Sequence, residues 1–456
     1  MGKYHFIAIG GIGMSGLAKY LLEDGHTVSG SDIADSKYID KLREMGAEVN
    51  VGHSANNVPE GAIVIKSTAI RDNNPEVIRA KELGLPIYHR SDLLKEIAAT
   101  AQKDGKCFIG FSGTHGKTTT SGLASYVLDK AGLEPSFVDG GIIPELNTNA
   151  QHRGKCIQTD LKLQDGCPVE CGKFFIAELD ESDGTIVKYS PDILVINNLE
   201  EDHIDFYKNG MPDLVKTFNQ AISQSKKVIV NNDNEGVKLL NGDFITFGLK
   251  EADYTAKSID NETLEIYHLG GLLTTLKIQL AGIHNVYNTL AVVAALNEAG
   301  VNVKSIAQHF YPFTGMGRRF QKVGEFDGIQ VFDDYAHHPT EIKAALQAAA
   351  SKFGKENVIA VFQPHRFTRL QALWNEFKTS FENAGRVIVA DVYAASEDPI
   401  EGVNSEKFAT ELQNCEYISG NMQEVAQKLK PALKSGNVVV GLGAGTITNL
   451  GKELIH

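Results

Sequence analysis

Short hydrophobic runs rich in β-branched residues alternate along the chain with amphipathic stretches, and glycine-containing or acidic turns separate them. Such an alternation of strands and helices is typical of α/β folds built on parallel sheets. The pattern occurs in three successive blocks of the chain. We therefore predict an α/β protein with three domains.

The hydrophobic runs predict strands in each block. They lie at Tyr4–Ile9, Thr27–Gly30, Glu48–Val51 and Ala62–Ser67, then at Cys107–Phe111, Phe174–Glu178 and Ile193–Asn197, and finally at Ile329–Phe332, Val358–Phe362, Val387–Ala390 and Val438–Gly441. A helix is predicted around Asn285–Ala299. We interpret the polar stretch Ala98–Lys106 and the Pro- and Gly-containing segment Pro312–Gly317 as linkers. The predicted domains are therefore residues 1–105, 106–312 and 313–456.

Composition narrows the class of protein. The 456 residues include 44 Lys and Arg against 57 Asp and Glu, a formal net charge of −13, which argues against nucleic acid or an anionic membrane as the main partner. The apolar run Leu290–Leu296 is far shorter than the ~20 residues that span a bilayer. Five cysteines, an odd number, indicate reduced thiols. We expect a cytoplasmic enzyme without membrane insertion, as a monomer or a homodimer.

The first glycine turn has the pattern GxGxxG and stands between a predicted strand and a predicted helix. Gly11, Gly13 and Gly16 allow a tight turn and a close approach to a pyrophosphate, which binds at the helix N-terminus. Asp32, at the end of the next strand, is a candidate to bond a ribose hydroxyl. Taken alone the pattern suggests NAD, and the alternative is a tight turn with no ligand. The first block is thus predicted to be Rossmann-like.

The second glycine turn, Gly113–Thr119, reads GTHGKTT and follows a predicted buried strand. In such a loop the backbone N–H groups cradle phosphates, the lysine (Lys117) reaches the β- and γ-phosphates, and the hydroxyl of Thr118 holds Mg²⁺. Phe111 stands where the usual pattern has its first glycine. The central block is therefore predicted to be a P-loop ATPase-type parallel sheet, and a simple dehydrogenase would need only the first turn.

Acidic residues follow two strands of the central block. Glu178, Asp180, Glu181 and Asp183 end one strand, and residues 198–205, which include His203, follow the next. Both segments lie at C-terminal strand ends, where open α/β sheets bind ligands. We predict a Mg²⁺ site formed by Thr118, Glu178 and His203 beside Lys117. The alternative is simple helix capping, above all for Asp183 and Asp202.

The third block, also predicted to be Rossmann-like, carries histidines and arginines at its strand ends. They occur in Asp333–Pro339 and Gln363–Arg369, while Asp391–Tyr393 follows a third strand. Arginine pairs with carboxylate or phosphate through its planar fork, so this edge is predicted to recognise an anion. Arg318 and Arg319, just after the second linker, are candidates to reach a γ-phosphate.

Taken together, these motifs resemble those of the Mur ligase family of bacterial cell-wall synthesis. The resemblance extends over nearly the whole chain and rests on Gly10–Gly16, Ser67–Ile70, the GTHGKTT loop, Asp180–Asp183, Asp202–Asp205, Gly282–Asn288, Arg318–Phe320, Asp333–Pro339 and Gln363–Arg369. It implies that the first domain holds a UDP-sugar and not NAD.

The resemblance also implies roles for particular residues. The UDP-sugar would be bound by Gly11, Gly13, Met14, Ser15, Asp32, Ser67 and Thr68. ATP would be bound by Gly113, Thr114, His115, Gly116, Lys117, Thr118, Thr119, His284, Asn285, Asn288 and Arg319. The amino acid would be bound by Tyr335, His337, Arg366 and Arg369, and the catalytic set would be Lys117, Glu178, His203, His337, Arg366 and Arg369.

The reaction implied by the resemblance is an ATP- and Mg²⁺-dependent ligation of L-alanine to UDP-N-acetylmuramate through an acyl phosphate. A peptide-recycling ligase of the same family is the nearest alternative. An NAD-dependent oxidoreductase, supported by Asp32, and a catalytically silent nucleotide-binding protein are more distant ones.

Two departures from the family pattern lead to further expectations. His152, Cys156, Cys167 and Cys171 are four potential soft ligands, so a structural Zn²⁺ is one hypothesis and a surface insertion with free thiols is the other. Asn197 stands where the family usually has threonine, and we expect it to lie apart from the chemistry.

Overall fold

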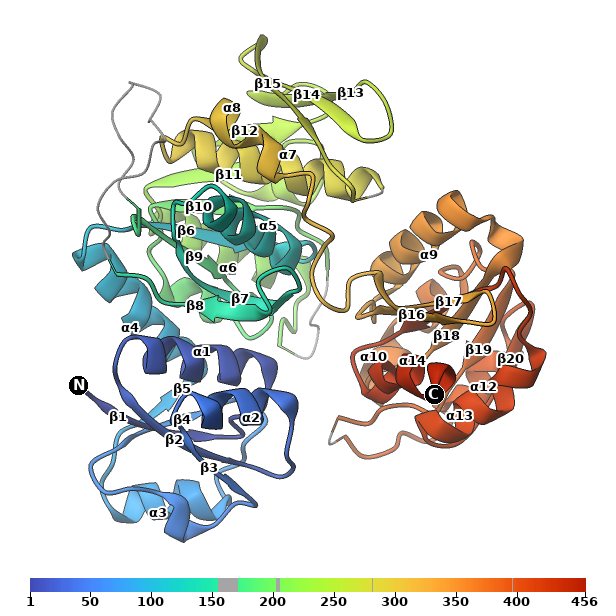
Figure 1. The fold of residues 1–456 in the computed structure, drawn as a ribbon, viewed down its shortest axis with the longest axis horizontal. Helices are drawn as coiled ribbons and strands as arrows, with labels where there is room; N and C mark the ends of the chain where they lie inside the picture. The colour runs from blue at the N-terminus through green and yellow to red at the C-terminus, as the bar shows by residue number, and fades with distance from the viewer. Residues whose placement is uncertain (155–170, 202–205, 281, 396) are drawn as a thin grey trace. The chain divides into compact units, whose positions relative to one another are not determined.

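The computed structural model describes residues 1–154, 171–201, 206–280, 282–395 and 397–456. These residues form two compact units, Met1–Thr314 and Gly315–His456. The first unit contains a five-stranded and a ten-stranded sheet, and the second contains a six-stranded sheet (Figure 1). The predicted α/β class is confirmed.

The first sheet is parallel and has the strand order β3-β2-β1-β4-β5. Its strands are β1 (Lys3–Ile7), β2 (Thr27–Asp32), β3 (Glu48–Val51), β4 (Ile63–Lys66) and β5 (Ile87–His89). The helices of this part are α1 (Ile12–Glu23), α2 (Lys37–Glu44), α3 (Pro75–Glu82) and α4 (Arg90–Lys103). The first predicted strand was too long: it ends at Ile7 because Ala8 turns the backbone with a φ of 66°.

The second sheet has the order β15-β14-β13-β12-β11-β10-β6-β9-β7-β8. Its parallel strands are β6 (Cys107–Ser112), β7 (Ser136–Ile143), β9 (Phe174–Glu178), β10 (Ile193–Ile196), β11 (Lys227–Asn231), β12 (Ile245–Gly248) and β13 (Tyr254–Ser258). The antiparallel strands β8 (Thr148–Gln151), β14 (Thr263–His268) and β15 (Gly271–Lys277) lie at its edges. Its helices are α5 (Lys117–Lys130), α6 (Met211–Ser223), α7 (Ile283–Glu298) and α8 (Val303–Ile306).

The third sheet has the order β16-β17-β21-β18-β19-β20, with β16 antiparallel to the rest. Its strands are β16 (Gln321–Phe326), β17 (Ile329–Asp334), β18 (Val358–Phe362), β19 (Arg386–Val389), β20 (Cys415–Tyr417) and β21 (Val438–Leu442). Its helices are α9 (Pro339–Phe353), α10 (Phe367–Ala372), α11 (Trp374–Lys378), α12 (Ser405–Thr410), α13 (Met422–Leu429) and α14 (Leu450–Ile455).

The linker that we predicted at Ala98–Lys106 is wrong for most of its length. Residues 98–103 are the last turns of α4, and Ala98 and Ala101 are buried with Ile97 in the hydrophobic core. The apolar residues of α4 recur at helical spacing, but small alanines gave a weak hydrophobic signal in the sequence. The other predicted linker contains the boundary between the two units, which falls after Thr314.

One hydrophobic core serves both sheets of the first unit. It includes Leu17 and Leu21 of α1 and Leu94 of α4, together with Phe108 and Phe175 of the second sheet. Helix α1 packs against β7 and β8, as Figure 1 shows. The two glycine turns are consequently held in one packed body.

Candidate functional site

The second glycine turn connects β6 to α5 and leaves room only for backbone. Gly113 and Gly116 have φ angles of +123° and +82°, in the region that favours glycine. A Cβ on Gly113 would lie 2.8 Å from the carbonyl oxygen of Asn198, and one on Gly116 would lie 2.7 Å from Oδ1 of Asn288. The loop therefore leads with a tight backbone turn into the N-terminus of α5, where the first N–H groups of the helix can bind phosphate.

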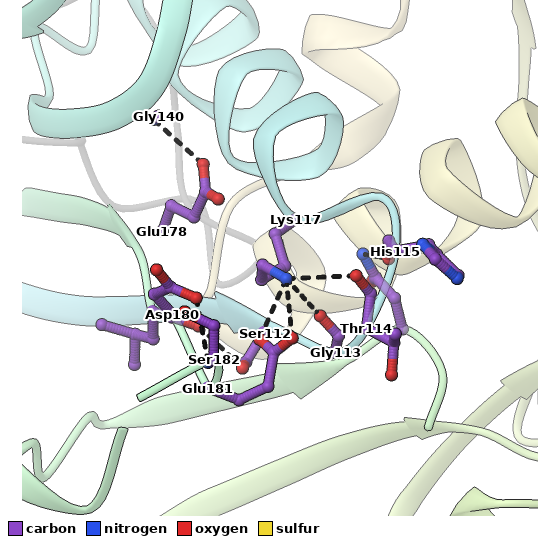
Figure 2. A network of polar contacts seen from close by, with 12 residues as sticks. Ser112, Gly113, Thr114, His115, Lys117, Gly140, Glu178, Asp180, Glu181 and Ser182 are labelled. Carbon is purple, nitrogen blue, oxygen red and sulfur yellow. Dashed lines mark hydrogen bonds and ion pairs between the residues drawn. The ribbon is translucent and has the colours of Figure 1, made fainter. Parts of the chain in front are cut away.

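Lys117 is held at the centre of this loop (Figure 2). Its ammonium donates to the carbonyl oxygens of Gly113 at 2.8 Å and Thr114 at 3.1 Å, and it pairs with the Glu181 carboxylate at 2.9 Å. Burial lowers the pKa of Lys117, but the carboxylates of Glu181, Asp180 and Glu178 raise it by more, so the lysine stays charged. The Glu181 carboxylate is thus the counter-ion of Lys117 and stands where another anion could pair with the lysine.

Three further carboxylates of the acidic segment have separate partners. Glu178, at the end of β9, accepts a hydrogen bond from the backbone N–H of Gly140 at 3.0 Å. Asp180 pairs with Arg90 at 3.0 Å. Burial raises the pKa of Asp180, but Lys117 and Arg90 lower it by more, to about 2. Asp183 accepts from the N–H and the hydroxyl of Thr185. The N-cap of the short helix that begins at Thr185 is Gly184, so the capping alternative is wrong for Asp183.

Asp139 on β7 is a functional candidate that the sequence analysis missed. Its side chain is 1% exposed, and neither of its oxygens accepts a hydrogen bond of normal geometry from the described residues. Burial raises the pKa of Asp139 well above the ordinary carboxyl value; the Ser121 and Ser125 hydroxyls lower it, and the Glu178 carboxylate raises it. An acidic residue in the middle of an apolar strand, as in Phe137-Val138-Asp139, was the signal in the sequence.

The loop and Glu178 fit a magnesium ion bound together with a nucleotide. Within the described ranges, no group of three or more His, Cys, Asp or Glu side chains is arranged to hold a metal on its own. Mg²⁺ in phosphate-binding sites is held by one or two carboxylates together with phosphate oxygens and water, so a larger protein ligand set is not needed. The predicted ligands Thr118 and Glu178 flank Lys117, and His203 lies outside the described residues.

The side-chain amides of Asn197 and Asn198, which directly follow β10, hydrogen-bond to the glycine turn. Oδ1 of Asn198 accepts from the backbone N–H of His115 at 2.7 Å, and His115 pairs with Glu200 at 3.4 Å. The Asn197 amide donates to the Thr120 hydroxyl at 3.1 Å and to the His115 carbonyl at 3.4 Å. Asn197, which we expected to lie apart from the chemistry, therefore braces the loop.

The predicted nucleotide residues of α7 lie beside the same loop. Asn288 is next to Gly116, as its distance to a Cβ there shows, and it donates to Oδ1 of Asn285 at 3.1 Å. The Asn285 amide lies 3.1 Å from a ring nitrogen of His284. Thr119 is buried under the loop. The structure therefore brings these α7 residues to the glycine turn.

The first glycine turn is braced by the residue predicted to bind ribose. Asp32 accepts from the backbone N–H groups of Gly10 at 2.8 Å and Ile33 at 2.7 Å. Met14 is buried in the core, and the Ser15 hydroxyl donates to the Ile12 carbonyl, so these two residues offer a ligand mainly their backbone. Ser67 and Thr68 directly follow β4, which is paired with β1.

A cleft connects the first glycine turn to the carboxylates. It is lined by Gly13 and Leu17 of α1, by Arg90, and by Asp139, Gly140, Glu178 and Asp180. A Cβ on Gly13 would lie 3.3 Å from Nη1 of Arg90, so this guanidinium sits directly beside the turn. Arg90 was missed because a single arginine at the start of a helix carries no signal.

In the C-terminal unit, the residues predicted to bind the amino acid follow the carboxyl ends of β17 and β18. His337 hydrogen-bonds to the Tyr335 carbonyl at 2.9 Å, and its ring packs edge-on against those of Tyr335 and His365. Arg369 lies 3.4 Å from His365, and the backbone N–H of Arg366 donates to the Tyr393 carbonyl. Burial lowers the pKa of His337 to about 4 and that of His365 to about 3.

Arg319 is placed within this unit by two contacts. It lies 3.5 Å from Glu341, and its guanidinium stands over the ring of Tyr335 at 5.5 Å. Neighbouring Arg318 pairs with Asp333 at 3.0 Å instead.

The zinc hypothesis falls largely outside the described residues, because Cys156 and Cys167 belong to the part that is not described. Of the other two members, Cys171 is buried and disulfide-bonded, so the expectation of reduced, free thiols is wrong for this cysteine. His152 lies 3.4 Å from Asp24 and packs against the ring of Tyr20.

Comparisons with known proteins match this chain over nearly its whole length. Residues 3–102 match the "Mur ligase family, catalytic domain", residues 111–296 the "Mur ligase middle domain" and residues 318–445 the "Mur ligase, glutamate ligase domain". The UDP-N-acetylmuramate–L-alanine ligase of Geotalea daltonii is 37% identical and covers 100% of this chain and 97% of its own length. That of Sulfurihydrogenibium sp. is 39% identical, covering 99% and 97%.

Among solved structures, the UDP-N-acetylmuramate-alanine ligase of Thermotoga maritima is similar to this chain. It has a TM-score of 0.81 and 28% identity, with 100% of this chain and 98% of that one covered. In the described part of the chain, no helix combines the length and the apolar character needed to traverse a bilayer.

Proposed function

The chain belongs to the Mur ligase family, and from this premise we propose that it joins L-alanine to the carboxylate of UDP-N-acetylmuramate at the expense of ATP. The observation that carries this proposal is the similarity, over the full length, to ligases named for that reaction. The glycine turn around Lys117 supplies the ATP-binding chemistry that the reaction needs.

The first step is phosphoryl transfer, which depends on positioning and on neutralising charge. The lactyl carboxylate attacks the γ-phosphorus of ATP, which gives an acyl phosphate and ADP. Lys117 leaves Glu181 to pair with the phosphates, and the backbone of Gly113–Thr119 holds them. Asn288, Asn285, His284 and Arg319 are proposed for the remaining contacts with ATP. Bound Mg²⁺, held by Thr118, Glu178 and His203, would offset the repulsion between the two anions.

In the second step the amine of L-alanine attacks the acyl carbon and phosphate leaves. Arg366 and Arg369 are proposed to hold the carboxylate of the amino acid, with Tyr335 beside it. His337 is proposed as the candidate acceptor of the ammonium proton, because burial keeps its imidazole neutral and it lies beside Tyr335 and close to His365.

The UDP-sugar is proposed to lie on the first glycine turn and to extend through the cleft toward Glu178. Gly11, Gly13, Met14 and Ser15 would bind it through their backbone, together with Asp32, Ser67 and Thr68. Arg90, which lies between the turn and Asp180, is well placed to hold a phosphate or the lactyl carboxylate.

We also propose the division of labour along the chain: residues 1–105 bind the UDP-sugar, 106–312 bind ATP, and 313–456 bind the amino acid. Because the reaction consumes ATP, we place it in the cytoplasm, with the enzyme as a monomer or homodimer.

The test is phosphate release in the presence of ATP, Mg²⁺ and UDP-N-acetylmuramate, with L-alanine, L-serine, glycine, D-glutamate or a stem tripeptide added singly. Release that requires both the UDP-sugar and L-alanine, with a product of matching mass, is the expected result. Release with the tripeptide and with none of the other acceptors would assign the chain to the peptide-recycling branch. Nicotinamide-dependent redox activity, with no phosphate release, would refute the ligase.

A further inference from the structure

Asp139 is a buried acid for which the described residues provide no counter-charge. Its side chain is 1% exposed, and neither oxygen accepts a hydrogen bond of normal geometry. The hydroxyls that face it belong to Ser121 and Ser125 of α5, which are themselves fully buried. Transferring a lone carboxylate into such an environment is very unfavourable, so the group needs a proton or a cation.

The strand register places Asp139 beside Glu178. Strands β7 and β9 are parallel, with Val138 opposite Ala177, so the next residues along the two strands are Asp139 and Glu178. The backbone N–H of Gly140, adjacent to Asp139, donates to the Glu178 carboxylate at 3.0 Å (Figure 2). Both acids line the same cleft. Glu178 has the same sign of charge and raises the free energy of the Asp139 anion further.

The nearby lysine makes its direct contacts with other groups. The ammonium of Lys117 is engaged by Glu181 and by the carbonyl oxygens of Gly113 and Thr114. The hydroxyls of Ser121 and Ser125 on α5, which lie beside Asp139, can ligate a cation through oxygen but carry no charge.

We propose that Asp139 is a second carboxylate for the divalent cation of the ATP site, so that this chain binds the metal with Asp139 and Glu178 together. This inference rests on the proposed function, which places Mg²⁺ at Thr118 and Glu178. A pair of carboxylates with phosphate oxygens is a donor set that Mg²⁺ accepts. The second carboxylate strengthens metal binding, and the bound cation offsets the repulsion between the two acids.

The experiment measures Mn²⁺ binding directly, by electron paramagnetic resonance of the full chain with ADP, so that the readout is independent of turnover. The variants are Asp139→Asn, Glu178→Gln and the control Asp129→Asn. The control removes a carboxylate of α5 that accepts a hydrogen bond from the Gln151 side chain. We expect D139N and E178Q each to weaken Mn²⁺ binding about tenfold or more, the scale of losses around metal ligands, and D129N to leave it unchanged.

The outcomes separate the two proposals. If E178Q weakens Mn²⁺ binding and D139N does not, the metal site stands and the role of Asp139 is refuted. Asn resembles a protonated, uncharged Asp139, so equal binding would mean that Asp139 contributes no charge to the metal. If neither variant weakens it, the metal site itself is refuted.

Thermal unfolding provides a second readout. In EDTA, D139N should melt above the wild type, since it removes the repulsion with Glu178, and it should gain less from added Mg²⁺. If D139N does not fold, Asp139→Ser replaces it with the same expectations for Mn²⁺ binding.

Discussion

Replacing Lys117 by methionine tests the ion pair at the centre of the loop. Met has nearly the volume of Lys but no charge, so the variant leaves Glu181, 1% exposed, without its cation. At the 3.0 Å between Nζ and Oε1 of Glu181, an effective dielectric constant of about 20 gives an attraction of about 5 kcal/mol. Loss of one partner of a buried pair typically costs about 3–5 kcal/mol. We expect K117M to lower the free energy of unfolding of the first unit by about 3 kcal/mol.

The double variant K117M/E181Q separates stability from chemistry. Removing both charges leaves no uncompensated carboxylate, so we expect it to recover about 2 kcal/mol of that loss, while ATP-dependent phosphate release stays abolished in both variants. Hydrogen exchange of the β6 and β9 amides measures the unfolding of this sheet, and the β18 amides of the other unit are the internal control. A K117M loss below about 1 kcal/mol, or no recovery in the double variant, would refute the assigned pair. Normal phosphate release by K117M would remove the loop from its proposed role.

Three further predictions follow from single sites. Gly116→Ala should weaken ADP binding tenfold or more, because the added Cβ would lie 2.7 Å from Oδ1 of Asn288. The control is Gly132→Ala, at a glycine with a φ of +75° and no atom within 4 Å of the added Cβ; it should lose only about 1 kcal/mol of stability and bind ADP normally. Equal ADP binding by both variants would contradict this prediction. Burial raises the pKa of Glu76, but hydrogen bonds from His5, Ser31 and Asn57 lower it by more, so the pKa in the folded protein lies below the usual 4.5. The ionised Glu76 therefore stabilises the fold fully above about pH 4.5, and this stabilisation is lost as the pH falls through the folded-state pKa. Urea unfolding should therefore show a shallower loss of stability below pH 4.5 in Glu76→Gln than in the wild type, and parallel curves would disprove the assignment. With a pKa near 4, His337 should contribute no ionisation to the pH profile of kcat/KM for the amino acid above about pH 5; an ionisation near 6.5 that disappears in His337→Gln would overturn it.

The sequence predicted best what depends on local pattern. Strands such as Phe174–Glu178 and Val358–Phe362 were predicted with the bounds that they have, because continuous β-branched and aromatic runs mark buried parallel strands. The glycine turn around Lys117 was equally legible, since its backbone geometry restricts the residue types. The antiparallel strands at the sheet edges were missed because they are short or half-exposed and alternate weakly.

What could not be predicted is the pairing of distant residues. Nothing local indicates that Glu181 would neutralise Lys117, that Arg90 would reach Asp180, or that Asp139 would stand next to Glu178. These neighbours follow from the order of strands in the sheet, where β9 lies between β6 and β7 although it comes after both in the chain.

The core shared by the first two sheets has a consequence for dissecting this protein into fragments. Leu94 and Ile97 of α4 pack in the same cluster as Phe108 and Phe175, and Asn149 donates to the Ile12 carbonyl at the start of α1. A fragment that stops near residue 105 would expose this apolar surface to water and would be prone to aggregate. The C-terminal unit has its own two apolar clusters, which contain no residue of the first unit. An expression library should therefore cut after Thr314, and should treat residues 1–314 as one piece.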